Sequence, residues 1–118
     1  MSGLTAASCF SGIGGAELAL PEADWLWSAE IEPFPCAVLE RRFGHPNLGD
    51  ITAPDFIDRA KAFGRLDLLC GGPPCQAFSI AGLRKGMLDP RGLLSLRFIQ
   101  VAHELASTVG LGNLLVEN

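Results

Sequence analysis

The sequence predicts a doubly wound α/β fold built on a mostly parallel sheet. Apolar runs of strand length alternate with segments of helical periodicity, and clusters of glycine and proline separate them. One run, residues 66–70, is apolar apart from Asp67, as is typical of a strand buried in a parallel sheet. Folds of this class bind ligands at the carboxyl ends of their strands. The 118 residues suffice for one domain or part of one.

The first strand is expected at residues 4–10, and a helix begins within residues 16–20. Three glycines between these segments end the strand: Gly12, Gly14 and Gly15. A second strand follows at residues 25–29, so the chain opens with a strand, a helix and a second strand.

A helix is predicted over residues 33–43, because prolines at its start fit the first turn and Gly44 is placed to end it. A short third strand is expected to finish near Asp50 and Ile51. The next helix is expected across residues 55–63, ahead of the fourth strand at residues 66–70.

Residues 71–90 form a long connection, which in a compact domain more often serves as a functional lid than as an idle loop. The clearest helix follows it. Apolar residues recur there at i, i+4, i+7, i+8 and i+11 and line one face: Leu94, Phe98, Val101, Ala102 and Leu105. A fifth strand is expected over residues 114–116.

The charge and hydropathy of the chain restrict its partners. The formal net charge of -4 argues against strong nucleic-acid binding by this segment by itself. A hydrophobic share of 48% is high for so short a chain, so some apolar surface is expected to face a partner or to promote self-association. We find no run of membrane-spanning length and no basic start of a secretory signal, and we expect a cytoplasmic protein.

The four cysteines form no C-x-x-C pair, and only two histidines accompany them, so no metal site is expected. Cys9, Cys36 and Cys70 are interpreted as small buried hydrophobic residues. Cys75 differs, because it follows Gly71, Gly72 and the two prolines 73 and 74 directly after the fourth strand. The prolines fix the backbone and present the thiol at the mouth of the site, where it is a candidate nucleophile. An isolated loop cysteine would instead be structural.

Residues 10–15, FSGIGG, lie between the first strand and the first helix, where glycines let a ligand approach the backbone. A dinucleotide motif would need a third glycine at the position of Glu17, whose charge would oppose a pyrophosphate. Glu30 follows Gly12 by 18 residues, close to the spacing at which an acid meets a ribose. Together these features favour an adenosyl cofactor without phosphates. Taken separately, they also fit an ordinary tight turn and a solvated acid.

The segment Val116-Glu117-Asn118 would bring a carboxyl group to the end of the fifth strand, beside the fourth. A carboxyl group there can donate a proton or a strong hydrogen bond to a ring nitrogen near Cys75. By itself, the same Glu-Asn pair would be read as a solvated end.

These motifs stand in an order that closely resembles the DNA cytosine-C5 methyltransferase family over essentially the whole chain. The matching segments are ASCFSGIGGAELAL, AEIEPFPCAVLERRFG, GDI, DLLCGGPPCQAFSIAG, GMLDPRG and VEN. The resemblance implies a Rossmann-like fold of S-adenosylmethionine-dependent methyltransferases. It also implies that residues 1–118 are the N-terminal part of the catalytic domain, with an incomplete sheet and without the target-recognition region.

The resemblance also implies residue roles. Cys75 would attack carbon 6 of cytosine, and Glu117 would engage ring nitrogen 3. Ser79 and Arg91 would lie near the DNA. Glu30 would bind the ribose of S-adenosylmethionine and Asp50 the adenine amino group. The cofactor contacts implied are Phe10, Gly12, Gly14, Glu30, Ile31, Asp50, Ile51, Gly72, Pro74 and Leu94.

The implied substrate is double-stranded DNA with a flipped cytosine, because ring atoms within a duplex cannot be reached. Amino-methylating DNA enzymes carry an aromatic residue after the two prolines, where this chain has Cys75 and Gln76, so carbon is the expected acceptor. Two interpretations of the chain stay open: a catalytic part completed by a C-terminal remainder or a second chain, and a non-catalytic fragment that binds the cofactor. The recognised DNA sequence cannot be read from these residues.

Overall fold

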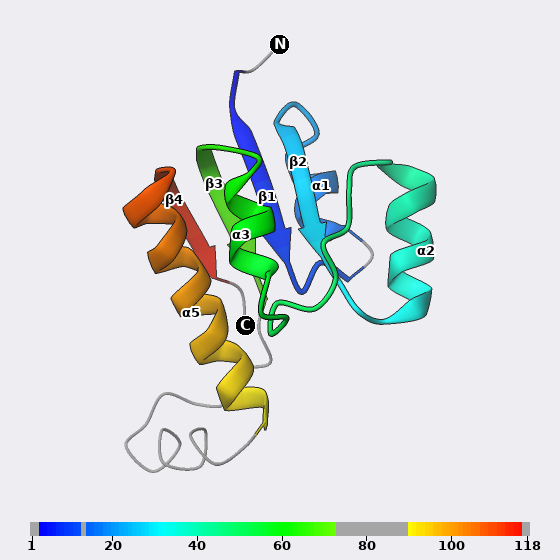
Figure 1. Cartoon of the computed structure of the whole chain (residues 1–118). Helices are drawn as coiled ribbons and strands as arrows, with labels where there is room; N and C mark the ends of the chain where they lie inside the picture. The colour runs from blue at the N-terminus through cyan, green and yellow to red at the C-terminus, as the bar shows by residue number, and fades with distance from the viewer. Residues whose placement is uncertain (1–2, 13, 73–89, 117–118) are drawn as a thin grey trace.

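Four parallel strands form one sheet in the order β2-β1-β3-β4 (Figure 1). The computed structural model describes residues 3–12, 14–72 and 90–116, and of residues 90 and 91 it describes the backbone. The strands are β1 (Thr5–Cys9), β2 (Asp24–Ala29), β3 (Leu66–Gly71) and β4 (Leu111–Val116). The crossover from β2 past β1 to β3 is the strand reversal of doubly wound sheets. The predicted fold class is confirmed.

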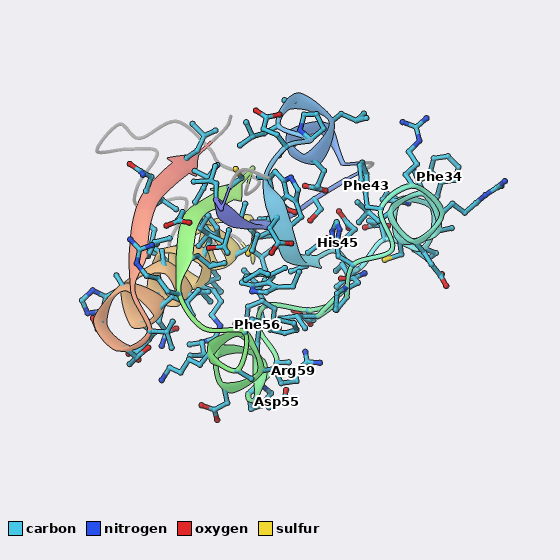
Figure 2. The ribbon with its side chains drawn as sticks, turned by 90° about the horizontal axis from the view of Figure 1, so that it is seen from above. Phe34, Phe43, His45, Asp55, Phe56 and Arg59 are labelled. Carbon is cyan, nitrogen blue, oxygen red and sulfur yellow. The ribbon has the colours of Figure 1, made fainter. Side chains whose placement is uncertain are left out.

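Helices cover both faces of the sheet (Figures 1 and 2). Helix α1 (Gly15–Ala19) lies on one face, and α3 (Phe56–Lys61) and α5 (Pro90–Thr108) lie on the other. Helix α2 (Pro33–Arg42) lies beside the sheet, next to β2. None of the described helices is long and apolar enough to cross a membrane.

The main core lies between the sheet and the pair α3 and α5. Trp27 of β2 meets Phe56 of α3 edge to face, with ring centroids 5.7 Å apart. The predicted apolar stripe of α5 packs on the same core, because Phe98, Val101 and Leu105 are buried against it. Such aromatic and aliphatic burial is the main stabilising contribution in a domain of this size.

Helix α2 ends as its sequence predicts. Gly44 has φ of +70°, and both its N–H and that of Phe43 donate to the carbonyl of Leu39. A glycine at this left-handed position avoids the steric cost that a Cβ would bring.

The prediction of a strand near Asp50 and Ile51 is wrong. In place of a strand, an isolated parallel bridge joins Asn47 to Ser28 of β2. The chain then leaves the sheet because Gly49 takes φ of +78° and the Asp50 carboxylate accepts hydrogen bonds from both the N–H and the hydroxyl of Thr52. An aspartate that bonds two residues ahead favours a turn over a strand.

Candidate functional site

A cavity of about 210 Å³ opens at the carboxyl ends of β1 and β2. Its walls come from the ends of these strands, from the loop before α3 and from the first turns of α5. The lining residues are Phe10, Ala29, Glu30, Ile31, Glu32, Gly49, Asp50, Ile51 and Leu94. The structure therefore brings together, around one cavity, six residues expected to contact a cofactor: Phe10, Glu30, Ile31, Asp50, Ile51 and Leu94.

Glu30 is held in place by three backbone N–H groups. Its Oε1 accepts from Gly12 at 2.7 Å, and its Oε2 accepts from Ile31 and Glu32, each at 2.9 Å. A carboxylate offers about four lone-pair sites, so these bonds orient the group and still leave capacity for a ligand. The bond to Gly12 also ties the glycine loop after β1 to the end of β2.

Asn47 joins two walls of the cavity, and sequence reasoning did not single it out. Its Oδ1 accepts from the backbone N–H groups of Glu30 and Gly49, both at 3.0 Å. Its Nδ2 donates to the carbonyl of Glu30 at 3.0 Å and to the sulfur of Cys36 at 3.2 Å. Cys36 itself is half-buried and donates to the Glu30 carbonyl, so it is a hydrogen-bonded residue and not the buried hydrophobic residue expected.

Asp50 presents an ionised carboxylate at the cavity. The hydroxyl of Thr52 and then its N–H lower the pKa of Asp50, and the positive charge of Arg97 lowers it further. Hydrogen bonds that favour the charged form have this effect. The site thus carries two fixed acids, Glu30 and Asp50, that line the same cavity.

A second cavity, of about 200 Å³, lies between the carboxyl ends of β1 and β3. It is lined by Ser8, Cys9, Phe10, Ser11, Gly15, Ala16, Cys70, Gly71 and Gly72. Phe10 lines both cavities and has φ of 54°, a left-handed conformation that is unusual for an aromatic residue. The Phe10 ring also packs edge to face on Phe98, with ring centroids 6.1 Å apart, so contact with the core holds Phe10 between the two cavities.

The predicted glycines of the first loop support the site indirectly. Gly12 has φ of +55° and donates its N–H to Glu30. Gly14 has φ of +89°, and a Cβ there would lie 2.3 Å from Cε2 of Phe43, so no larger residue fits. Neither glycine lines the two cavities. Figure 2 shows Phe43 and His45 between β2 and α2, where the two rings lie 5.8 Å apart.

Several predicted residues lie outside the described part of the chain: Pro74, Cys75, Ser79 and Glu117, together with the side chain of Arg91. Their roles remain predictions.

Cys9 is one of the cysteines that the structure describes. Burial raises the pKa of the Cys9 thiol far above its ordinary value, and the neighbouring Cys70 raises it further. Such a thiol is a poor nucleophile. Within residues 3–12, 14–72 and 90–116, no cluster of His, Cys, Asp and Glu could hold a metal ion.

Glu17 is a buried acid that sequence reasoning did not interpret as part of the core. Its side chain is 1% exposed, and neither carboxyl oxygen has a hydrogen-bond partner among the described residues. Burial raises the pKa of Glu17, and the nearby Ser8 hydroxyl opposes this shift only in part. The neutral acid is therefore favoured more strongly than in water.

The parallel doubly wound sheet, with cavities at the carboxyl ends of its central strands, defines a Rossmann-like domain of the methyltransferase type. The crystal structure of the Dnmt2 methyltransferase of S. pombe matches 96% of this chain with a TM-score of 0.66, at 22% identity and over 33% of its own length. The chain belongs to the C-5 cytosine-specific DNA methylase family, whose model matches residues 4–112.

Curated relatives agree with this family. The type II methyltransferase M.HhaI of Haemophilus parahaemolyticus is 38% identical over 88% of this chain, and M.AquIA of Picosynechococcus sp. is 39% identical over 82%. A DNA N-6-adenine-methyltransferase of Escherichia phage P1 is 44% identical over 89%. The chain spans 31%, 42% and 14% of these three proteins, respectively. The chain spans only a small part of the protein named for adenine methylation, and the chain itself matches the family model for cytosine enzymes.

Proposed function

We propose that this chain is the cofactor-binding and nucleophile-bearing part of an enzyme that methylates carbon 5 of cytosine in DNA, with S-adenosylmethionine as the methyl donor. The observation that carries the proposal is the cavity at the ends of β1 and β2, which Glu30 and Asp50 both line. Family membership supports the reaction, and the cavity supports the cofactor.

The two cavities suit the two halves of the cofactor. Each is smaller than the roughly 300 Å³ at which pockets for drug-sized ligands begin, but they adjoin at Phe10. The nucleoside would lie in the first cavity, with its ribose hydroxyls on Glu30 and its adenine amino group on Asp50. The methionine part would extend past Phe10 toward Gly72 and the segment that carries Cys75.

When bound, S-adenosylmethionine would supply an electrophilic methyl group. Carbon 5 of cytosine is a poor nucleophile until the thiolate of Cys75 adds to carbon 6 and makes an enamine. Glu117 would donate a proton or a strong hydrogen bond to nitrogen 3 as charge develops there. The backbone of residues 71–74 would hold Cys75 at the carboxyl end of β3, beside the second cavity.

The cofactor assignment predicts that Glu30→Ala weakens the binding of S-adenosylmethionine to the complete enzyme. The expected loss is on the order of 1 to 3 kcal/mol, since charge-assisted hydrogen bonds to the ribose would disappear. Titration calorimetry measures it, and Glu40→Ala on α2 is the matched control because Glu40 is an exposed acid away from the cavity. Equal affinities for the two variants would contradict the role of Glu30.

The catalytic assignment predicts that Cys75 forms a covalent adduct with DNA containing 5-fluorocytosine. Cys75→Ala should abolish the trapped complex on denaturing gels, whereas Cys36→Ala should retain it, because Cys36 is hydrogen-bonded to Glu30 and Asn47 and lines neither cavity. A Cys75→Ala enzyme that still traps DNA would overturn the assignment. Methyl incorporation into adenine in place of cytosine would overturn the choice of acceptor.

A further inference from the structure

Arg97 of α5 stabilises one wall of the first cavity through hydrogen bonds to backbone carbonyls. Its Nε donates to the carbonyl of Ile51 at 2.6 Å, and its Nη2 donates to the carbonyl of Ala53 at 3.2 Å. Its Nη1 donates to Oε1 of Gln100, one turn further along the helix, at 2.9 Å. All three guanidinium nitrogens are therefore engaged, and two of them fix the turn formed by residues 50–53.

This turn contributes directly to the cavity. Asp50 and Ile51 both line it, and the Ala53 N–H closes the turn on the carbonyl of Asp50 at 3.1 Å. Asp50 is exposed and Ile51 is buried, so the turn presents one polar and one apolar side chain. Local hydrogen bonds from Thr52 and Ala53 to Asp50 close the turn, and Arg97 adds two bonds that tie it to another element, α5.

Helix α5 reaches the cavity twice. Leu94 lines it directly, and Arg97, three residues later on the same face of the helix, fixes the turn of residues 50–53 through the carbonyl of Ile51. The short Nε to Ile51 distance is that of a charge-assisted bond, the stronger class of hydrogen bond. The positive charge also faces the Asp50 carboxylate.

We propose that Arg97 is a positioning residue for cofactor binding, which holds residues 50–53 in the shape that receives the adenosyl group. The inference rests on the proposed function, because it takes the cavity to be the cofactor site. A wall that is already ordered loses less conformational entropy on binding, so its ordering raises affinity without a direct contact. Arg97 does not line the cavity and acts through the backbone of Ile51 and Ala53.

Arg59 of α3 provides a matched control. It also donates to a backbone carbonyl, that of Leu48, which lies just before this turn, and it pairs with Asp55 at 3.6 Å (Figure 2). Leu48 does not line the cavity, however. A merely structural role for arginines that bind carbonyls in or just before this turn predicts similar effects for Arg59→Gln and Arg97→Gln. The positioning role predicts that the affinity changes for Arg97→Gln and not for Arg59→Gln.

The test is calorimetric titration of S-adenosylmethionine into the complete enzyme and its Arg97→Gln, Arg97→Lys and Arg59→Gln variants, with thermal unfolding of each. We expect Arg97→Gln to weaken binding by on the order of tenfold. Arg97→Lys should restore part of the affinity, because an ammonium group can reach the Ile51 carbonyl. Arg59→Gln should bind as the parent does, even if its melting temperature falls. If Arg97→Gln binds S-adenosylmethionine with the affinity of the parent, the proposal is wrong. If Arg97→Gln does not fold, the proposal is wrong when Arg97→Lys keeps both the parental affinity and the parental rate of hydrogen exchange at the Ala53 amide.

Hydrogen exchange separates failure of this inference from failure of the proposed function. If the parent enzyme does not bind S-adenosylmethionine, the proposed function fails. The amide of Ala53, which closes the turn, still reports on Arg97. Faster exchange of this amide in an Arg97 variant than in Arg59→Gln supports the positioning role, and equal protection in the variants and the parent contradicts it.

Discussion

Glu17 carries a carboxyl group into the interior, where neither oxygen has a hydrogen-bond partner among the described residues and the Ser8 hydroxyl is merely nearby. It stands in the first turn of α1, where its charge would favour the helix dipole, but its oxygens are buried. Burying a carboxylate without a partner costs more free energy than its interaction with the helix dipole contributes. The raised pKa of Glu17 follows from this burial.

We predict that Glu17→Met stabilises the fold near neutral pH, because methionine has a similar length and a good helix propensity. The expected gain in the free energy of unfolding is about 1 to 3 kcal/mol. A raised folded-state pKa means that the native protein loses stability as pH rises from the unfolded pKa of about 4.3 through the folded value. The gain should therefore shrink as pH falls below about 4, where the acid is protonated in both states.

Urea denaturation of the parent and of Glu17→Met near pH 7 and near pH 4 measures this difference. Glu40→Met on α2 controls for helix propensity, because Glu40 is exposed. A gain of equal size at the two pH values would show that improved packing, and not removal of a buried charge, stabilises the variant.

Sequence reasoning at the residue scale found cavity-lining residues better than the residues that support them. Glu30 follows β2 at a recognisable spacing from Gly12, so motif and resemblance both pointed to it, whereas the resemblance pointed to Asp50. Asn47 and Arg97 act on backbone carbonyls and N–H groups supplied by distant segments. Such bonds depend on how the chain packs and leave no periodic pattern in the sequence, so neither residue could be singled out beforehand.

The predicted helices and strands match the observed ones where the apolar periodicity is strong. They differ where pairing between strands determines the structure. The stripe of α5 was predicted and is buried. Strand β4 begins at Leu111, three residues earlier than expected. Gly112 and Asn113 are poor strand formers, but they belong to the strand because this segment pairs in parallel with β3. Partner strands commonly override local preference in this way.

The contact between β3 and α5 leads to a prediction about Gly71. A Cβ on Gly71 would lie 2.3 Å from Cζ of Phe98, which is 1% exposed and also meets Phe10. Gly71→Ala must therefore displace α5 or the Phe98 ring, and we expect a loss of about 1 to 3 kcal/mol in the free energy of unfolding. Urea denaturation measures the loss.

Gly15→Ala is the control for this substitution. A Cβ on Gly15 meets nothing within 4 Å, and alanine is the better helix former, so this variant should gain up to about 1 kcal/mol. A Gly71→Ala protein as stable as the parent would mean that β3 and α5 pack less closely than the structure describes.

At the scale of the whole molecule, apolar side chains are exposed at the β4 edge of the described sheet and on the neighbouring helix α5. Helix α5 exposes Leu93, Leu96 and Ile99, and the neighbouring edge strand β4 exposes Leu114, Leu115 and Val116. A shallow depression of about 330 Å³ lies between the helix and the strand, bounded by Ile99, His103 and Leu114 among others. Exposed apolar patches on an edge strand promote association.

The last prediction concerns the 118 residues purified by themselves: they should bind S-adenosylmethionine weakly, self-associate, and not methylate DNA. The net charge of -4 gives little attraction for phosphates, and the apolar side of α5 and β4 favours contact with another protein surface. The chain also spans less than half the length of the three curated relatives described above. Sedimentation measures the association, and incorporation of tritiated methyl groups into DNA measures the activity, each with and without a co-expressed remainder of such an enzyme. Cys75-dependent incorporation of methyl groups by a monodisperse 118-residue protein would show that catalysis does not require another protein surface to pack on β4 and on the exposed apolar residues of α5.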